Sequence, residues 1–218
     1  MKFKYTNLKK RIIPIILVQD YQVVKSRQFK DFRTFGNLEQ TINVFNNRNV
    51  DEIIILDIDA SKNEKKVNLE ILSILSKNNI MPLSFGGGIN SIKDIELCLK
   101  HGCDKVVINS TSINNIKFIK EASKVFGKQC IVCSIDYKFE NNIFKIHSHS
   151  GLNTQKLKIR NFIEDLTNLG AGEIILTSVN NEGMMKGFDK NLSQIIPKEL
   201  EIPILVNGGC GEPKDILE

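Results

Sequence analysis

Two glycine-rich turns, each following a short apolar run, recur along this chain and constrain its fold more than any other feature. The segment Met81–Asn90 reads MPLSFGGGIN, and Ile202–Gly211, which reads IPILVNGGCG, follows it 121 positions later. Two further pairs of apolar segments keep this offset or nearly keep it: Glu52–Leu56 with Glu173–Thr177, and Ile13–Leu17 with Val132–Asp136. A register kept at three places indicates two homologous halves, each built from strand–helix units.

Short apolar segments alternate with segments of helical spacing. Strands are expected at Arg11–Leu17, Glu52–Ile58, Met81–Phe85, Lys105–Asn109, Cys130–Tyr137, Glu173–Thr177 and Ile204–Asn207. Helices are expected at Leu38–Asn47, Leu69–Leu75, Ile92–Leu99, Ile116–Phe126, Phe162–Leu169 and Leu192–Ile196. Val23–Lys25 is expected to be extended, and Phe144–His149 to return as part of a hairpin. The alternation implies right-handed crossovers and a parallel sheet, and two halves of four units predict an α/β fold, the (β/α)₈ TIM barrel.

The second half of the repeat is shorter than the first. The counterpart of Lys105–Ser110 falls beyond Glu218, the last residue of the sequence. We therefore expect residues 1–218 to form a single barrel domain that is incomplete at its C-terminus, before strand eight. The strands at Ile13–Leu17 and Ile204–Val206 should then each present an unpaired apolar edge.

Composition narrows the classes of partner. The net charge of +5 comes from scattered lysines, which suits anionic substrates better than nucleic acid, since the latter usually meets a clustered basic surface. No apolar run approaches the ~18 residues of a membrane span, and no signal peptide is evident. Five cysteines, an odd number, suggest a reducing, cytoplasmic setting. We expect no metal and no cofactor, because Cys130 and Cys133 should face opposite sides of a strand.

In barrels of this kind, function gathers at the C-terminal ends of the strands. There the two glycine turns, Gly86–Gly88 and Gly208–Gly211, expose backbone N–H groups that can bind phosphate. Two such turns suggest an elongated bisphosphorylated substrate, although tight turns without a ligand would have the same sequence. Asp136 is the best candidate acid or base, since a carboxyl group at a barrel mouth can be desolvated. The alternative is a structural carboxylate that accepts a loop N–H.

The combination of motifs resembles the cyclase subunit of imidazole glycerol phosphate synthase over roughly residues 9–218. The motifs are Arg11–Pro14, Val23–Lys25, Asp51–Ile53, Leu56–Ile58, Phe85–Ile89, Asp104–Val106, Ser134–Asp136, Gly170–Ile174 and Asn207–Gly209. The resemblance implies a (β/α)₈ barrel paired with a glutaminase subunit at the barrel bottom. Ammonia from the glutaminase would cross the barrel to a bisphosphorylated aminoimidazole precursor at the opposite mouth.

The resemblance also implies roles for individual residues. Asp136 would be one of two catalytic aspartates. The phosphate-binding residues would be Gly87, Gly88, Asn109, Ser110, Gly208 and Gly209. Other substrate-site residues would be Lys25, Asp57, Ser150 and Thr177. The family's ring of alternating charges, an ammonia gate, would be Arg11, Glu52, Lys105 and Glu173, with Asp104 facing the glutaminase. Four charges that each begin an apolar strand could instead form a plain stabilising ion-pair ring.

Two departures point away from the family's main branch. Leu17 stands where the family has its other catalytic aspartate, and a leucine cannot exchange protons. The loop around Asn180, Glu182, Met184 and Met185 replaces a more polar family segment. Leu17 and the segment Lys25–Lys30 resemble a paralogous branch that supplies ammonia for acetamidino groups on nucleotide-linked or surface-polysaccharide sugars. A stand-alone phosphate-binding isomerase and a catalytically silent scaffold for the glutaminase remain alternatives.

Overall fold

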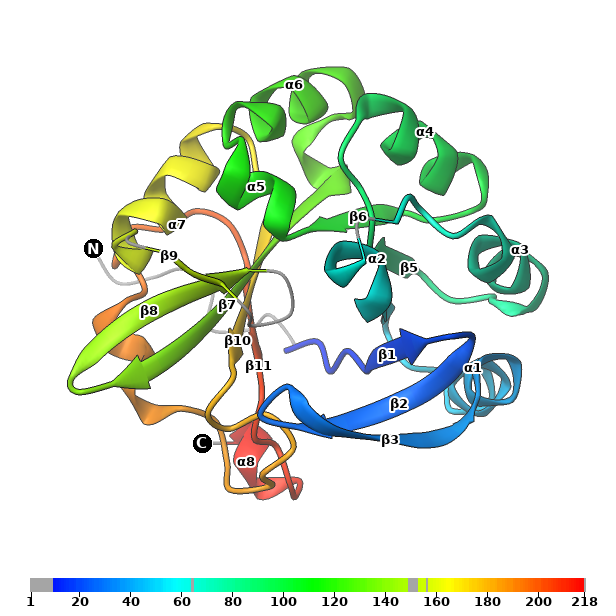
Figure 1. The fold of residues 1–218 in the computed structure, drawn as a ribbon, viewed down its shortest axis with the longest axis horizontal. Helices are drawn as coiled ribbons and strands as arrows, with labels where there is room; N and C mark the ends of the chain where they lie inside the picture. Colours follow the sequence, from blue (N-terminus) through cyan, green and yellow to red (C-terminus); the bar gives the residue numbers. More distant parts are fainter. Residues whose placement is uncertain (1–9, 64, 149–152, 156, 218) are drawn as a thin grey trace.

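The chain forms one curled sheet with helices on its outer side (Figure 1). The computed structural model describes residues 10–63, 65–148, 153–155 and 157–217. Parallel strands follow one another around the sheet in the order β1 (Ile15–Gln19), β4 (Ile53–Asp57), β5 (Leu83–Gly86), β6 (Lys105–Ile108), β7 (Ile131–Glu140), β10 (Glu173–Ser178) and β11 (Ile204–Asn207). This order of neighbouring parallel strands agrees with the predicted barrel class.

The sheet is open between β11 and β1. Within the described ranges, no strand pairs with the outer edge of β11, as expected. A groove of about 1160 Å³ lies there, lined on its two sides by residues such as Ile13 and Leu205. The prediction that the edge of β1 is unpaired is wrong for the second half of this strand. There β2 (Gln22–Arg27) pairs antiparallel with Leu17–Gln19.

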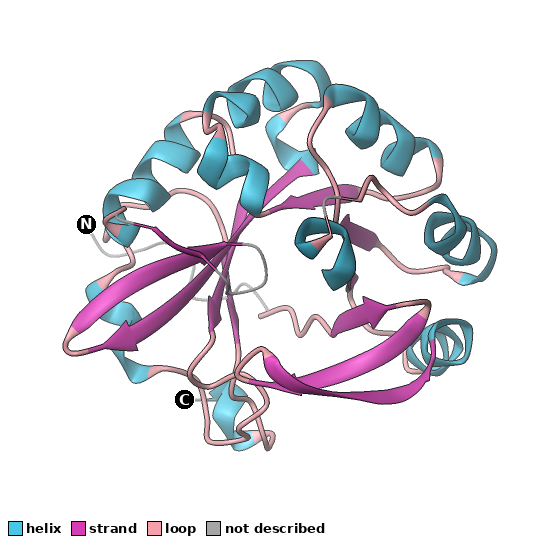
Figure 2. Ribbon diagram, viewed as in Figure 1, coloured by secondary structure: helices cyan, strands magenta, loops and turns pink. Residues whose placement is uncertain are grey.

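Two hairpins project from the curled sheet (Figure 2). One joins β2 to β3 (Lys30–Asn37), and the other joins β7 to β8 (Ile143–Ser148), which also pairs with β9 (Asn153–Gln155). The expected return strand is thus present in its described part, whereas His149 lies outside the described residues. Three two-residue turns have positive φ at both positions, at Asp20–Tyr21, Gln28–Phe29 and Asn141–Asn142, the geometry that matches the twist of a hairpin.

The longer helices lie on the outer side of the sheet (Figure 1). They are α1 (Leu38–Asn47), α3 (Leu69–Asn78), α4 (Ile92–Lys100), α6 (Lys117–Phe126) and α7 (Ile159–Asn168). Shorter elements are α2 (Ile58–Lys62), α5 (Ser110–Asn114), α8 (Lys214–Leu217) and the 3₁₀ helices η1 (Lys128–Cys130) and η2 (Lys190–Gln194). The helix expected at Leu192–Ile196 is the 3₁₀ helix η2, which begins earlier, at Lys190. The Asp189 side chain caps the start of η2 by accepting the N–H of Asn191.

The core has two parts, one on each face of the sheet. The larger cluster packs the helices against the sheet, and a smaller one fills the concave face with Ile54, Val107, Val132 and Ile175. These four belong to β4, β6, β7 and β10, and the residues next to each of them in its strand point to the opposite face. Among the described residues, no helix has the length and apolar character needed to cross a membrane.

Candidate active site

A pocket of about 150 Å³ opens at the C-terminal ends of the parallel strands. Four predicted substrate-site residues from four strand ends line it: Asp57, Asn109, Asp136 and Thr177. Gly87, Gly88 and Ser110 line it as well. The structure therefore brings together residues from the positions at which the apolar runs of the sequence end.

Asp136 lies at the centre of a small hydrogen-bond network. Nδ2 of Asn109 donates to Asp136 Oδ2 at 3.1 Å and also to the carbonyl oxygen of Ser134 at 3.2 Å. Burial raises the pKa of Asp136 to about 7; the hydrogen bond from Asn109 opposes this shift, the charge of Glu182 adds to it and the Thr177 hydroxyl again opposes it. A carboxyl group with such a pKa can both donate and accept a proton near neutral pH.

The amide of Asn109 holds Asp136, and the same residue lines the pocket in which its phosphate contact was expected. Ser110 and Thr111 line the pocket at the start of α5, and Thr111 Oγ1 donates to the carbonyl oxygen of Ile89 at 2.6 Å. The short helix α5 thus connects the pocket to the first glycine turn.

The first glycine turn needs glycine for packing as well as for any ligand. Gly87 has φ +124°, and a Cβ there would lie 2.5 Å from the carbonyl oxygen of Asp57. Gly88 has φ +72°, and its Cβ would lie 2.7 Å from the backbone carbon of Lys66. The following helix end is occupied, because the Asp94 carboxylate accepts the N–H groups of Asn90 and Ser91. The N–H groups of the two residues between the turn and α4 are therefore already bound within the protein.

Three predicted site residues are not brought into the pocket. Gly208 and Gly209 do not line it, although Asn207 does, and the carbonyl oxygen of Gly209 accepts the N–H of Gly187 at 2.8 Å. Lys25 is exposed on β2, with Nζ 3.9 Å from the ring centroid of Phe35. Ser150 lies outside the described residues. Of the two glycine turns expected to form two phosphate pockets on opposite sides, the first lines this pocket, and the second contributes only the neighbouring Asn207 to it.

Sequence reasoning missed part of the pocket wall. Phe29 and Phe32, from the turn after β2 and from β3, line the pocket together with Leu17, which gives it an apolar side. Glu182, from the loop after β10, lines it too, and burial raises the pKa of this carboxyl group. Glu182 stood out in the sequence only as a departure from the family pattern; its place beyond a strand end was the available signal.

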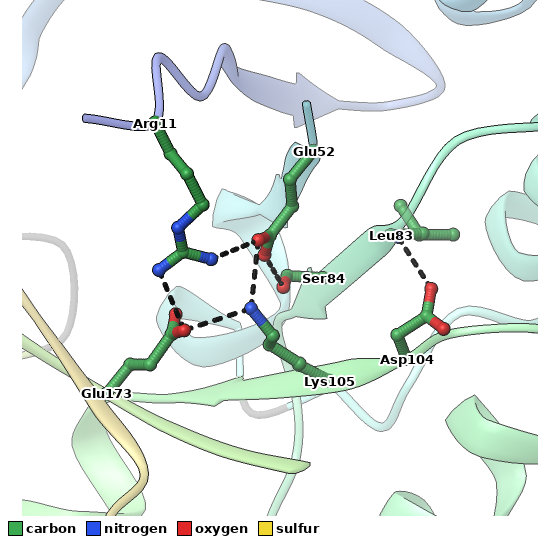
Figure 3. Close-up of polar contacts among 7 residues, drawn as sticks. All are labelled: Arg11, Glu52, Leu83, Ser84, Asp104, Lys105 and Glu173. Carbon is green, nitrogen blue, oxygen red and sulfur yellow. Dashed lines mark hydrogen bonds and ion pairs between the residues drawn. The ribbon is translucent and has the colours of Figure 1, made fainter. Parts of the chain in front are cut away.

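At the opposite end of the strands, the four predicted ring residues meet (Figure 3). Arg11 Nη1 lies 2.8 Å from Glu52 Oε2, and Nη2 lies 2.8 Å from Glu173 Oε1. Lys105 Nζ bridges the same two oxygens at 2.8 and 3.1 Å, and Ser84 Oγ donates to the other oxygen of Glu52 at 2.7 Å. Two cations and two anions thus neutralise one another in a largely buried layer.

Asp104 lies beside this ring but is not part of it. Its Oδ2 accepts the backbone N–H of Leu83 at 2.9 Å, and its own N–H donates to the carbonyl oxygen of Leu83 at 2.8 Å (Figure 3). This pair ties the start of β5 to the start of β6. The residue is exposed on the face where a partner was expected.

The charged ring, the apolar layer and the pocket lie one above another on the concave face because every second residue of a strand points to the same side. On β10, Glu173 belongs to the ring, Ile175 to the apolar cluster and Thr177 to the pocket. On β6 and the residue after it, Lys105, Val107 and Asn109 repeat this order. The concave face therefore carries charge at one end, apolar side chains in the middle and ionisable groups at the other end.

Comparison with known proteins places the chain in a family. The family model described as "Histidine biosynthesis protein" matches residues 11–218. A Campylobacter jejuni protein with the provisional name imidazole glycerol phosphate synthase subunit hisF2 is 46% identical over 211 residues, which cover 97% of this chain and 84% of that protein. The imidazole glycerol phosphate synthase subunit HisF of Staphylococcus saprophyticus is 38% identical over 213 residues, with the same two coverages. The chain belongs to the histidine biosynthesis protein family, among the relatives of the HisF subunit of imidazole glycerol phosphate synthase.

Proposed function

We propose that this chain is a synthase subunit that receives ammonia from a separate glutaminase at the charged ring and adds it to an acceptor in the pocket. The observation that carries this proposal is the order of the three layers along the concave face. A neutral ammonia molecule can cross the apolar layer of Ile54, Val107, Val132 and Ile175, whereas an ammonium ion would lose its hydration there at high cost.

The ring is the proposed gate. Its four side chains are bound to one another, so a molecule entering along the axis must displace at least one ion pair. Both cations bridge Glu52 and Glu173, but the Lys105 ammonium is a compact charge on a flexible stem, whereas the Arg11 guanidinium is a planar, pre-organised fork. Lys105 is therefore the residue proposed to move. The exposed Asp104 and Ile12 belong to the same end of the strands and are proposed to meet the glutaminase.

The acceptor is proposed to be phosphorylated or nucleotide-linked. The turn Gly86–Gly88 and the side chains of Ser110 and Thr111 supply one polar wall that suits a phosphate group. Asp136 is the proposed acid or base, held by Asn109. Leu17, Phe29 and Phe32 give the pocket an apolar surface. Because Leu17 cannot exchange protons, it supports the branch that builds acetamidino sugars over imidazole ring closure.

The test is reconstitution with a glutaminase subunit of an imidazole glycerol phosphate synthase. We expect this chain to raise glutamate release from glutamine by at least about tenfold, since completing an oxyanion hole or its equivalent is worth that much or more. The matched control is the chain with Glu52→Lys, which places three cations beside one anion in the ring. Equal glutamate release with and without the chain would rule out the proposed partnership. That result would favour the alternative of a stand-alone isomerase.

A further inference from the structure

Glu182 occupies a fixed position at the edge of the pocket. Its N–H donates to the carbonyl oxygen of Ser178 at 2.9 Å, and its own carbonyl oxygen accepts the N–H of Gln28 at 2.9 Å. The backbone is thus held from the end of β10 on one side and from the β2–β3 turn on the other. The next residue, Gly183, approaches the carbonyl oxygen of Ser26 so closely that a Cβ would lie 2.0 Å from it. A carboxyl group on this segment is therefore presented to the pocket by packed backbone.

The ionisable side chains that line the pocket are all acidic. They are Asp57 from β4, Asp136 from β7 and Glu182 from the loop after β10; among the described lining residues there is no lysine, arginine or histidine. Asp57 is already engaged, because its Oδ1 accepts the N–H groups of Asp59 and Ala60. Asp136 and Glu182 are the two of these three carboxyl groups that do not cap the start of a helix.

The charge of Glu182 acts on Asp136. Burial is the main cause of the raised pKa of Asp136, and the charge of Glu182 raises it further. Burial also raises the pKa of Glu182. Two carboxyl groups that line one pocket without a cation among its described lining residues resist becoming ionised together.

We propose that Glu182 and Asp136 form the acid–base pair of this pocket, with Glu182 supplying the second proton-exchanging group that Leu17 cannot supply. The inference rests on the proposed function, since it needs ammonia to arrive from the ring. Sequence reasoning had left the mouth with a single acid or base; the structure adds a second one from a different strand end.

The reaction that this pair suits is addition of ammonia to a carbonyl group. The nitrogen lone pair forms a bond to the carbonyl carbon, and the π electrons of the C=O bond move to the oxygen. The protonated member of the pair gives its proton to that oxygen, and the ionised member removes a proton from the new C–NH₃⁺ group. The product is a carbinolamine, and the pair again holds one proton, now on the other residue. No further reactant is required for this step.

The first experiment measures the coupling directly. Protein labelled with ¹³C at the aspartate carboxyl carbons is titrated by NMR, and the Asp136 signal is identified by its loss in Asp136→Asn. In Glu182→Gln we expect the midpoint of Asp136 to fall by about one pH unit or more, the size of interaction that defines a coupled pair. The control is Glu140→Gln, an exposed carboxylate paired with Lys145 on the β7–β8 hairpin, which should leave the midpoint unchanged. An unchanged midpoint in Glu182→Gln would overturn the proposal.

A conservative variant separates charge from folding. Glu182→Asp keeps the carboxylate on a shorter stem, so its Asp136 midpoint should stay closer to the wild-type value than that of Glu182→Gln. If both variants shifted Asp136 equally, the effect would come from disturbed packing of the loop and the proposal would fail.

The second experiment tests catalysis. Cells producing the chain together with its glutaminase receive glutamine labelled with ¹⁵N in the amide group, and ¹⁵N-labelled small molecules are compared by mass spectrometry. Glu182→Gln should lower the labelled product at least tenfold while glutamate release is unchanged; an unchanged amount of product would overturn the acid–base role. Absence of labelled product from the wild-type chain would count against the proposed function. The NMR titration needs neither ammonia nor acceptor, so it tests the pair of carboxyl groups separately.

Discussion

Asn109 donates a hydrogen bond from Nδ2 to Oδ2 of Asp136 at 3.1 Å, joining the end of β6 to β7 across the pocket. The same amide also donates to the carbonyl oxygen of Ser134, so the side chain is fixed in one orientation. The Oδ2 oxygen of Asp136 is thus bonded to the protein itself.

Asp136→Asn should lower the rate of synthesis by about 100-fold or more, the usual contribution of a positioned acid or base. Ammonium chloride in place of glutamine bypasses the glutaminase, so the loss should be the same with either nitrogen source. Asn109→Ala, which removes the holding hydrogen bond but leaves the carboxyl group, should cost less than Asp136→Asn. The opposite ranking would show that Asp136 is only a structural carboxylate.

The same residue should make stability depend on pH. Its pKa is raised from 3.8 to about 7, so the folded state binds this proton more tightly than the unfolded state. The contribution to stability is fully present below pH 4 and is lost as the pH rises through about 7. Asp136→Asn should therefore gain roughly 1–3 kcal/mol over wild type between pH 4 and pH 8, since one pKa unit is worth about 1.4 kcal/mol before screening by solvent in the pocket. Urea unfolding of the variant and the wild type at both pH values measures this difference. Glu140→Gln is the control, and its stability relative to wild type should be the same at both pH values.

The charged ring, if it is the proposed gate, gives a prediction about coupling. Lys105→Ala leaves Arg11 as the one cation of the ring facing Glu52 and Glu173, so the ring loses two of its four ion pairs. We expect glutamine hydrolysis to continue while synthesis per glutamine consumed falls, with acceptor binding retained. Lys100→Ala on α4 removes an exposed ion pair with Glu96 and should change neither. Parallel loss of hydrolysis and synthesis in Lys105→Ala would contradict a gate.

Strand periodicity made much of this arrangement predictable. The residues that begin apolar runs, such as Glu52 and Glu173, had to face one end of the concave surface, and those that end the runs had to face the other. Contacts between segments were not predictable in this way. Asn109 could equally have met a ligand, and only the path of β7 beside it makes Asp136 its partner.

Turn chemistry explains the other differences. Asn141–Asn142 is a sequence signal for a hairpin, and the hairpin was expected there. Gln28–Phe29 adopts the same left-handed geometry with residues that are not enriched in it, so the β2–β3 hairpin and its phenylalanines were not foreseen. Glu182 was missed for a related reason, since its loop is positioned by contacts with Ser26 and Gln28 of that hairpin.

Glycine at position 88 should be a structural requirement. Gly88→Ala combines a left-handed φ of +72° with an overlap against the backbone of Lys66. Gly102 also has positive φ, +88°, but nothing lies within 4 Å of its Cβ position. Gly102→Ala should cost about 1–2 kcal/mol of unfolding free energy, the cost of the left-handed conformation, and Gly88→Ala should cost more. Equal losses in thermal or urea unfolding would show that the turn relaxes freely.

The last prediction concerns the acceptor. In this pocket Leu17, on β1, provides an apolar surface, and the available carboxyl groups come from β7 and the loop after β10. Closure of an imidazole ring in the family uses an acid and a base on the strands that end at Leu17 and Asp136, and here one of these positions cannot exchange protons. We therefore expect negligible imidazole glycerol phosphate production, and no growth when this chain replaces the cyclase subunit in a histidine auxotroph. The HisF subunit of Staphylococcus saprophyticus, 38% identical, is the positive control in the same host. Growth supported by this chain would show that Leu17 is no obstacle and would reject the sugar-amidination branch.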